Sequence, residues 1–352
     1  MASLISLLLL LVSVAFFTLL ERKVLGYLIL RRGPNKPALS GCPVPFADAL
    51  KLLSKPFIIP VLGSPFLVPF SCFLGFLIPS LLWVFAATPS SFWDWSHSLL
   101  SVLIWMSFSV YALLAAGWGS NSKYSILGGT RSIAQCISYE VCFSLLLLSF
   151  CLFTSFVLFS VRCSWGLLAF THLSAILFLV VLAETNRSPF DFSEGESELV
   201  SGYNVEYSGP GFVVLFLSEY LSILFVSFLC SSLSRNGTYF PTVIPCLFYA
   251  FSFVWARGSL PRYRYDQLMS LSWKCLLPVV LSSYLILLLL YYHLFALKAL
   301  HTTIMHFSPF ILYIFSDLTL FHPFFYSVAL YLFFTFYRAP VFLRVWFRAS
   351  RL

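Results

Sequence analysis

Residues 2–23 read ASLISLLLLLVSVAFFTLLERK, an apolar run that ends at three charged side chains. About 20 apolar residues in a helix cross the hydrocarbon layer of a bilayer once. Similar runs recur along the 352-residue chain, which is 60% hydrophobic and 10% charged. Inside a bilayer every backbone polar group must be paired within the protein, which favours helices over irregular chain or open sheet. The sequence therefore predicts an all-α, polytopic membrane protein.

Eight transmembrane helices are expected up to residue 297, with a ninth beyond it. They are expected near residues 2–20, 66–86, 99–118, 133–160, 167–183, 211–230, 240–256, 276–297 and 319–337. If the N-terminus lies on the outer side, all of the 21 lysines and arginines fall on inner loops except Arg162, Arg235 and Lys298. This asymmetry follows the positive-inside rule and supports the segmentation, ninth helix included.

Two further segments flank these helices. Residues 43–55 read PVPFADALKLLSK and are too short and too charged to span, so a short interfacial helix is expected after the first crossing. One membrane domain is expected over 1–297, followed by a C-terminal extension over 298–352. In that extension Arg344, Arg348 and Arg351 share one helical face, which suits an inner-leaflet anchor or a subunit contact.

Several classes of site are not indicated. The nine cysteines include no C-x-x-C pair, and the six histidines show no metal spacing, so no metal site is expected. The sequence contains no dinucleotide fingerprint, P-loop or nucleophile elbow, so no redox cofactor is expected on this chain. The net charge of +8 gathers at the ends of apolar runs, which fits membrane orientation better than nucleic-acid binding.

An acidic stretch stands out between residues 184 and 206. It holds six of the chain's 13 acidic residues, namely Glu184, Asp191, Glu194, Glu196, Glu198 and Glu206. Carboxylates held close raise one another's pKa and titrate as a group, as a proton-handling cluster requires. The simpler alternative is a solvated acidic loop in which Ser193 and Glu196 form a helix capping box.

Two more acids, Glu140 and Glu219, lie inside or near the inner halves of long apolar runs. Placing an ionisable group inside a membrane costs on the order of 2.5–3.5 kcal/mol. Such a group is therefore usually kept for function, on a path that faces the bundle interior. The structural alternative is a buried ion pair with Arg131 or Arg187 that only holds helices together. Arg262, Arg264 and Asp266 alternate with tyrosines in a later loop, a pattern typical of an interfacial anchor or a docking surface for an acidic partner.

The same residues carry a family resemblance. The sequence is similar to membrane subunit 1 of NADH:quinone oxidoreductase, respiratory complex I, called the H subunit in bacteria. The stretches that carry the resemblance are ERKVLGY (21–27), RRGPN (31–35), PFADA (45–49), SNSKY (120–124), SYEV (138–141), AETNRSPFD (183–191), EGESELVSGYNVEY (194–207) and PRYRYDQLM (261–269). The resemblance stops at Lys298. Where the family usually has Leu-Gln-Pro, this chain has Pro43-Val44-Pro45, without the polar side chain.

The resemblance implies an eight-helix subunit that lines the ubiquinone chamber, where the peripheral and membrane arms of complex I meet. The residues it assigns to quinone entry and binding are Arg22, Arg32, Phe46 and Asp48. Those it assigns to a proton relay are Glu140, Glu184, Asp191, Glu194, Glu196, Glu198, Glu206 and Glu219. Their expected ion-pair partners are Arg187, Arg262, Arg264 and Asp266.

The resemblance also implies the partners. These are the quinone-module subunits of the peripheral arm, the neighbouring membrane-arm subunits, ubiquinone as substrate and membrane lipids, but no nucleic acid; FMN, NADH and iron–sulfur clusters belong to partner subunits. Forty phenylalanines and the absence of a visible presequence favour the mitochondrial inner membrane, with a bacterial plasma membrane as the alternative. Alternative functions are an ion or solute transporter, a hydrogenase-type membrane anchor subunit and a purely structural anchor.

Overall fold

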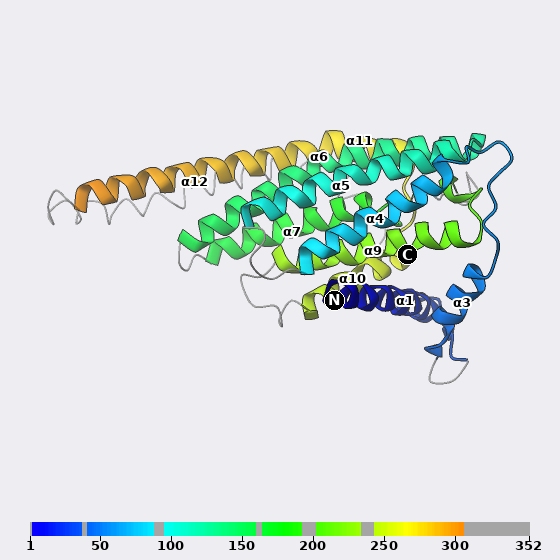
Figure 1. Ribbon diagram of the computed structural model, residues 1–352. Coiled ribbons are helices and arrows are strands. Elements are labelled where there is room, and N and C mark those ends of the chain that lie inside the picture. Colours follow the sequence, from blue (N-terminus) through cyan, green and yellow to red (C-terminus); the bar gives the residue numbers. More distant parts are fainter. Residues whose placement is uncertain are drawn as a thin grey trace. The chain divides into compact units, whose positions relative to one another are not determined.

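The computed structural model describes residues 2–36, 41–87, 95–159, 164–191, 202–233 and 243–305, which form helices and turns and contain no strand (Figure 1). The helices are α1 (Ala2–Leu28), α3 (Val44–Leu53), α4 (Leu67–Ala87), α5 (Trp95–Gly119), α6 (Lys123–Phe159), α7 (Ser164–Glu184), η1 (Gly202–Asn204), α9 (Gly209–Leu233), α10 (Val243–Ser259), α11 (Tyr265–Ser270), the π-helix η3 (Leu271–Leu276) and α12 (Leu277–Met305). The chain divides into two units, Met1–Leu288 and Leu289–Leu352. Every contact described below lies within the first unit.

The prediction of an all-helical membrane protein is confirmed for the described residues. A helix overlaps each of the eight ranges expected up to residue 297, and six helices are long and apolar enough to cross a bilayer. The apolar helices His172–Glu184 and Val243–Ser259 are shorter. The count of eight crossings and the division at residues 297 and 298 therefore stay predictions. The expected ninth helix and the basic tail lie outside the described residues.

Helix α1 is longer than the sequence suggested. It was expected to end near residue 20, where three charged side chains follow the apolar run, but it continues to Leu28. Val24 and Leu25 pack against the hydrophobic core and carry the helix past the charges. Glu21 is consequently buried inside the bundle, with 6% of its surface exposed.

The short helix expected over residues 43–55 is present as α3. Proline occupies positions 43 and 45 at its start, where a missing N–H breaks no helical hydrogen bond. Two contacts dock α3 on α1: Arg22 Nη1 donates to Asp48 Oδ2 at 2.6 Å, and the rings of Phe16 and Phe46 meet edge-on at 5.9 Å. The apolar side chains of Leu50 and Leu53 remain exposed, as in a helix that lies on a membrane surface.

Helices α4, α5 and α6 run side by side, and α9 packs against α4 (Figure 1). Small residues allow the close approach of α5 and α6, because a Cβ added at Gly117 would lie 3.2 Å from the Cα of Gly129. Between α4 and α9, Trp83 Nε1 donates a hydrogen bond to the Leu221 carbonyl at 3.1 Å. Close backbones and interhelical hydrogen bonds thus hold the bundle together where the surrounding lipid gives no hydrophobic drive.

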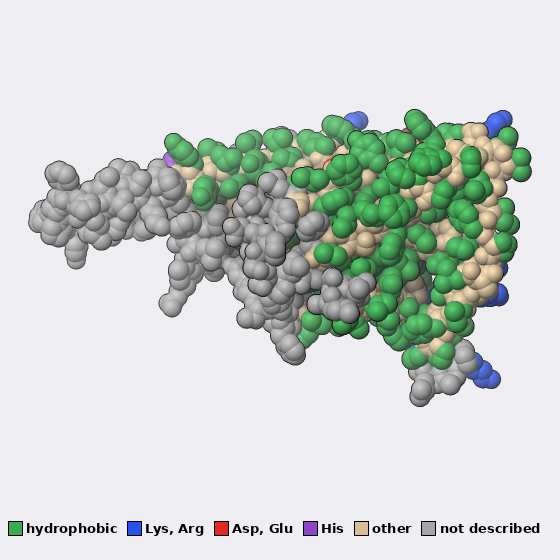
Figure 2. Space-filling model, viewed as in Figure 1, with side chains coloured by type: hydrophobic (Ala, Val, Ile, Leu, Met, Phe, Trp, Pro, Cys, Tyr) green, Lys and Arg blue, Asp and Glu red, His purple; other side chains and the backbone are tan. Residues whose placement is uncertain are grey.

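The surface matches this interpretation. Figure 2 shows a face covered mostly by hydrophobic side chains, with lysine and arginine side chains gathered mainly at one edge. Buried serines inside the bundle donate to the carbonyl three residues earlier, as Ser71 does to Val68 at 2.8 Å and Ser149 to Leu146 at 2.7 Å. These hydroxyls are satisfied within their own helices, so apolar segments tolerate them.

Tyr207 ties three segments together just before α9. Its hydroxyl donates to the Ala116 carbonyl at 3.1 Å and shares a hydrogen bond with the Ser71 hydroxyl at 2.9 Å. Burial raises the pKa of Tyr207 to about 12, so the hydroxyl stays protonated at neutral pH.

Replacing Tyr207 by Phe is expected to lower the free energy of unfolding by about 1–2 kcal/mol, because it removes the hydrogen bonds of the tyrosine hydroxyl to the Ala116 carbonyl and the Ser71 hydroxyl. Chemical denaturation in detergent micelles measures this difference. The matched control is Tyr111→Phe, since that tyrosine is 61% exposed. Equal losses of unfolding free energy for Tyr207→Phe and Tyr111→Phe would contradict a stabilising role of the Tyr207 hydrogen bonds.

Candidate functional site

A buried amide on α6 positions the start of the acidic stretch. Gln135 is fully buried, and its Nε2 donates to the carbonyls of Ala183 at 2.8 Å and Phe190 at 2.9 Å. These two bonds fix both ends of the turn that follows α7. Glu184 and Asp191, the acids directly after each carbonyl, are therefore held against α6.

Glu184 and Glu219 line the same cavity. It has a volume of about 90 Å³ and lies among α4, α5, α6, α7, η1 and α9. Glu184 is 7% exposed, and its Oε2 has no hydrogen-bond partner among the residues that the structure describes. Glu219 accepts a hydrogen bond from the hydroxyl of Tyr203, which also lines the cavity. Two carboxyl groups thus line one mainly apolar cavity that is large enough for several water molecules.

Glu140 lies close to this pair. It is half-buried on α6, one helical turn beyond the cavity-lining Cys136, and it interacts electrostatically with Glu184. Glu140 and Glu184 therefore interact although they are far apart in the sequence. Glu184 and Glu219 are carboxyl groups that can each take up or release a proton at the cavity.

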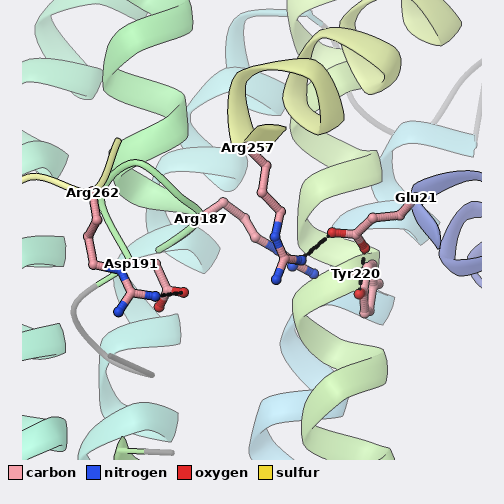
Figure 3. A network of polar contacts seen from close by, with 6 residues as sticks. All are labelled: Glu21, Arg187, Asp191, Tyr220, Arg257 and Arg262. Atoms are coloured by element: carbon pink, nitrogen blue, oxygen red, sulfur yellow. Dashed lines mark hydrogen bonds and ion pairs between the residues drawn. The ribbon is translucent and has the colours of Figure 1, made fainter. Parts of the chain in front are cut away.

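A second cluster surrounds the buried carboxylate of Glu21. Figure 3 shows the guanidinium groups of Arg187 and Arg257 pointing toward it, with Tyr220 below. Arg187 Nη1 lies 3.4 Å from Glu21 Oε1, Arg257 donates to the same oxygen, and the Tyr220 hydroxyl donates to Oε2 at 2.7 Å. The cluster joins α1, the turn after α7, α9 and α10.

Arg187 is buried yet charged. Burial works against its charge, but the Glu21 carboxylate outweighs burial and raises the pKa of Arg187 above its usual value. The guanidinium carbon also lies 4.4 Å from the centre of the Tyr220 ring, in a cation–π contact. Arg187 therefore carries a permanent positive charge next to α9, the helix that holds Glu219.

Comparison with known proteins gives the family of this chain. The family model described as NADH dehydrogenase matches residues 1–290. The chain belongs to the NADH dehydrogenase family. Its relatives include proteins named NADH-ubiquinone oxidoreductase chain 1 from Locusta migratoria, 45% identical over 77% of this chain and 89% of the relative, and from Artemia franciscana, 47% identical over 77% and 92%. The protein of that name from Strongylocentrotus purpuratus is 45% identical over 78% and 89%.

In this member of the NADH dehydrogenase family, two loops meet beside Asp191. Arg262 Nη2 lies 3.5 Å from Asp191 Oδ2, the Tyr263 amide donates to the Pro189 carbonyl at 3.1 Å, and the rings of Phe190 and Tyr263 stack at 5.4 Å. The loop before α11 thus packs against Pro189, Phe190 and Asp191 in the first part of the acidic stretch.

The other residues singled out by sequence are dispersed. Arg264 and Asp266 pair with each other at 3.3 Å on the surface, and Arg32 is exposed. Glu206 is half-buried between η1 and α9. Glu194, Glu196 and Glu198 lie outside the described residues, as does Ser193 of the capping box. Within the described ranges, no group of three His, Cys, Asp or Glu side chains is arranged to hold a metal ion.

Sequence reasoning missed part of this family member's site. Glu21 was interpreted as a charge that ends the first crossing, and its partners Arg257 and Tyr220 were not selected. Gln135 was also overlooked. The usable signal for Glu21 is its place inside the ERKVLGY stretch, whose apolar residues continue the helical pattern beyond the charges.

Proposed function

We propose that this chain lines part of the quinone chamber and links quinone reduction to a carboxylate path through Glu140, Glu184 and Glu219. As a member of its family it is an integral membrane subunit of NADH-ubiquinone oxidoreductase, and other subunits of that complex are its partners. The proposal for the path rests on one observation above all: the buried Glu184 and the half-buried Glu219 line one cavity.

The chemistry of quinone reduction supports this proposal. Reduction of a quinone to a quinol takes up two protons and changes the charge in a water-poor space. Carboxyl groups near such a change alter their proton affinity. Glu140 and Glu184 already interact electrostatically, so protonation of one changes the other.

Quinone entry is proposed beside α1 and α3. Arg22 and Asp48 form an ion pair there, and Phe46 is exposed next to it and packs on Phe16. A polar pair beside an aromatic ring at the membrane surface suits a quinone headgroup that arrives from the lipid. Arg32, exposed in the turn after α1, is proposed as part of the same entrance.

The remaining assignments complete the proposal. Ubiquinone is the substrate, FMN, NADH and iron–sulfur clusters are bound by partner subunits, and the complex lies in the mitochondrial inner membrane. Asp191, Glu194, Glu196, Glu198 and Glu206 extend the carboxylate path, and Arg262, Arg264 and Asp266 are inner-side ion-pair partners. The match to NADH-ubiquinone oxidoreductase chain 1 proteins favours this function over a transporter or a hydrogenase-type anchor.

Glu184→Gln and Glu140→Gln test the proposal in the assembled complex. Each is expected to lower the number of protons pumped per NADH oxidised by at least about tenfold, because an amide neither takes up nor releases a proton. Reconstituted vesicles measure pumping and NADH oxidation together. The control is Lys123→Gln at the exposed start of α6, which should leave both unchanged. Normal pumping in assembled Glu184→Gln and Glu140→Gln complexes would refute the proposal.

A further inference from the structure

Arg187 contacts one carboxylate and interacts electrostatically with a second. Its Nη1 lies 3.4 Å from Glu21 Oε1, and its guanidinium carbon lies 4.4 Å from the ring centre of Tyr220, the residue next to Glu219 on α9. It also interacts electrostatically with Glu219. One cation thus interacts both with a carboxylate of α1 and with a carboxylate that lines the cavity.

The contact between Arg187 and Glu21 is loose. Charge-assisted hydrogen bonds between nitrogen and oxygen usually measure 2.7–2.9 Å, and 3.4 Å is clearly longer. Glu21 holds two closer partners, Arg257 on one oxygen and the Tyr220 hydroxyl at 2.7 Å on the other. Its charge therefore stays paired if Arg187 moves away.

One nitrogen of Arg187 is available for a further hydrogen bond. Its side chain is 14% exposed, and within the described ranges its buried Nη2 makes no hydrogen bond. An unsatisfied buried donor is unfavourable, so a nearby acceptor attracts it. The guanidinium carbon lies over the Tyr220 ring, where the group can turn without losing the cation–π contact.

We propose that Arg187 is a positioning residue that exchanges between Glu21 and Glu219 as the charge on Glu219 changes. When Glu219 is ionised, its carboxylate draws the guanidinium away from Glu21. When Glu219 takes up a proton from the cavity, Arg187 returns to Glu21. This inference rests on the proposed role of Glu219 in the carboxylate path.

The groups that surround the exchange come from every packed element. Glu21 lies on α1, Arg187 and Asp191 follow α7, and Arg257 lies on α10; Glu219 and Tyr220 lie on α9, and Tyr203 lies in η1. Arg257 and Tyr220 fix Glu21 in place, while Tyr203 holds one oxygen of Glu219. Of the two arginines at Glu21, Arg187 is the more loosely bound.

A double-mutant cycle in the assembled complex tests the exchange. We expect Glu21→Gln and Glu219→Gln each to lower the protons pumped per NADH oxidised. Their combined effect should fall short of the product of the single effects by about fivefold, because both act through Arg187. In an Arg187→Gln background this coupling should vanish. If that variant does not assemble, Arg187→Lys keeps the charge with a single nitrogen and should weaken the coupling.

The outcomes separate the two proposals. Normal pumping by the assembled Glu219→Gln complex would refute the carboxylate path itself. Impaired pumping with single effects that multiply independently would refute only the exchange, and so would a coupling that persists without Arg187. A control cycle that pairs Glu219→Gln with Lys123→Gln, at the exposed start of α6, should show no coupling.

Discussion

Replacing Gly128 by Val is expected to prevent the normal accumulation of this chain in its complex. A Cβ at this position would lie 2.9 Å from the Cα of Gly202 and 3.0 Å from the amide nitrogen of Tyr203. Both neighbours are backbone atoms, which cannot turn aside as a flexible side chain can. Overpacking costs typically about 1–3 kcal/mol, and this contact is expected to reach the upper end or exceed it.

The effect should reach the site as well as the fold. Displacement of η1 moves Tyr203, whose hydroxyl donates to Glu219. Native gels measure assembly, and NADH:quinone activity of the remaining complex measures the site. The matched control is Gly75→Ala, because a Cβ there would meet Leu215 and Ser218 only at 3.5 and 3.7 Å, an ordinary contact. Normal assembly of the Gly128→Val chain would contradict the proposed packing.

Replacing Glu21 by Leu is expected to have the second large effect. Leucine suits the apolar run of α1, but it removes the carboxylate that Arg187 and Arg257 share. Removal of one partner from a buried pair costs about 3–5 kcal/mol, because a buried charge is left uncompensated. We expect loss of assembly, measured as the amount of intact complex in the membrane.

Two further variants serve as comparisons for Glu21→Leu. Glu21→Gln keeps the shape and an oxygen that can accept the Tyr220 hydroxyl hydrogen bond, so it should assemble better than Glu21→Leu. Asp266→Asn breaks an ion pair whose members are 79% and 75% exposed, and should cost less than about 1 kcal/mol. If all three variants assembled equally well, Glu21 would have no structural role.

The helices were largely predictable because apolar runs specify them directly. The expected range 66–86 agrees closely with α4 at Leu67–Ala87. An uninterrupted apolar segment specifies such a helix without any information on tertiary contacts. The predicted end of α1 was wrong, because charges after an apolar run usually mark the membrane surface. Glu21 stays inside the bundle because Arg187 and Arg257, 166 and 236 positions away in sequence, neutralise it.

The site was predictable only in its chemistry. Glu140, Glu184 and Glu219 could be selected because acids in apolar surroundings are costly without a reason. That Glu184 and Glu219 share a cavity depends on the packing of segments far apart in the sequence, which no local pattern encodes. Gln135 escaped notice because a neutral amide in an apolar run carries no such signal, although its two hydrogen bonds position the acidic stretch.

Infrared difference spectroscopy of the intact complex, oxidised against reduced, tests the carboxylate path most directly. If Glu184 and Glu219 respond to quinone reduction, the difference spectrum contains carboxyl C=O stretching bands that Glu184→Gln and Glu219→Gln each diminish. Lys123→Gln should leave those bands unchanged. Difference spectra that are identical in the parent complex and in both glutamine variants would contradict the coupling of these buried acids to the quinone.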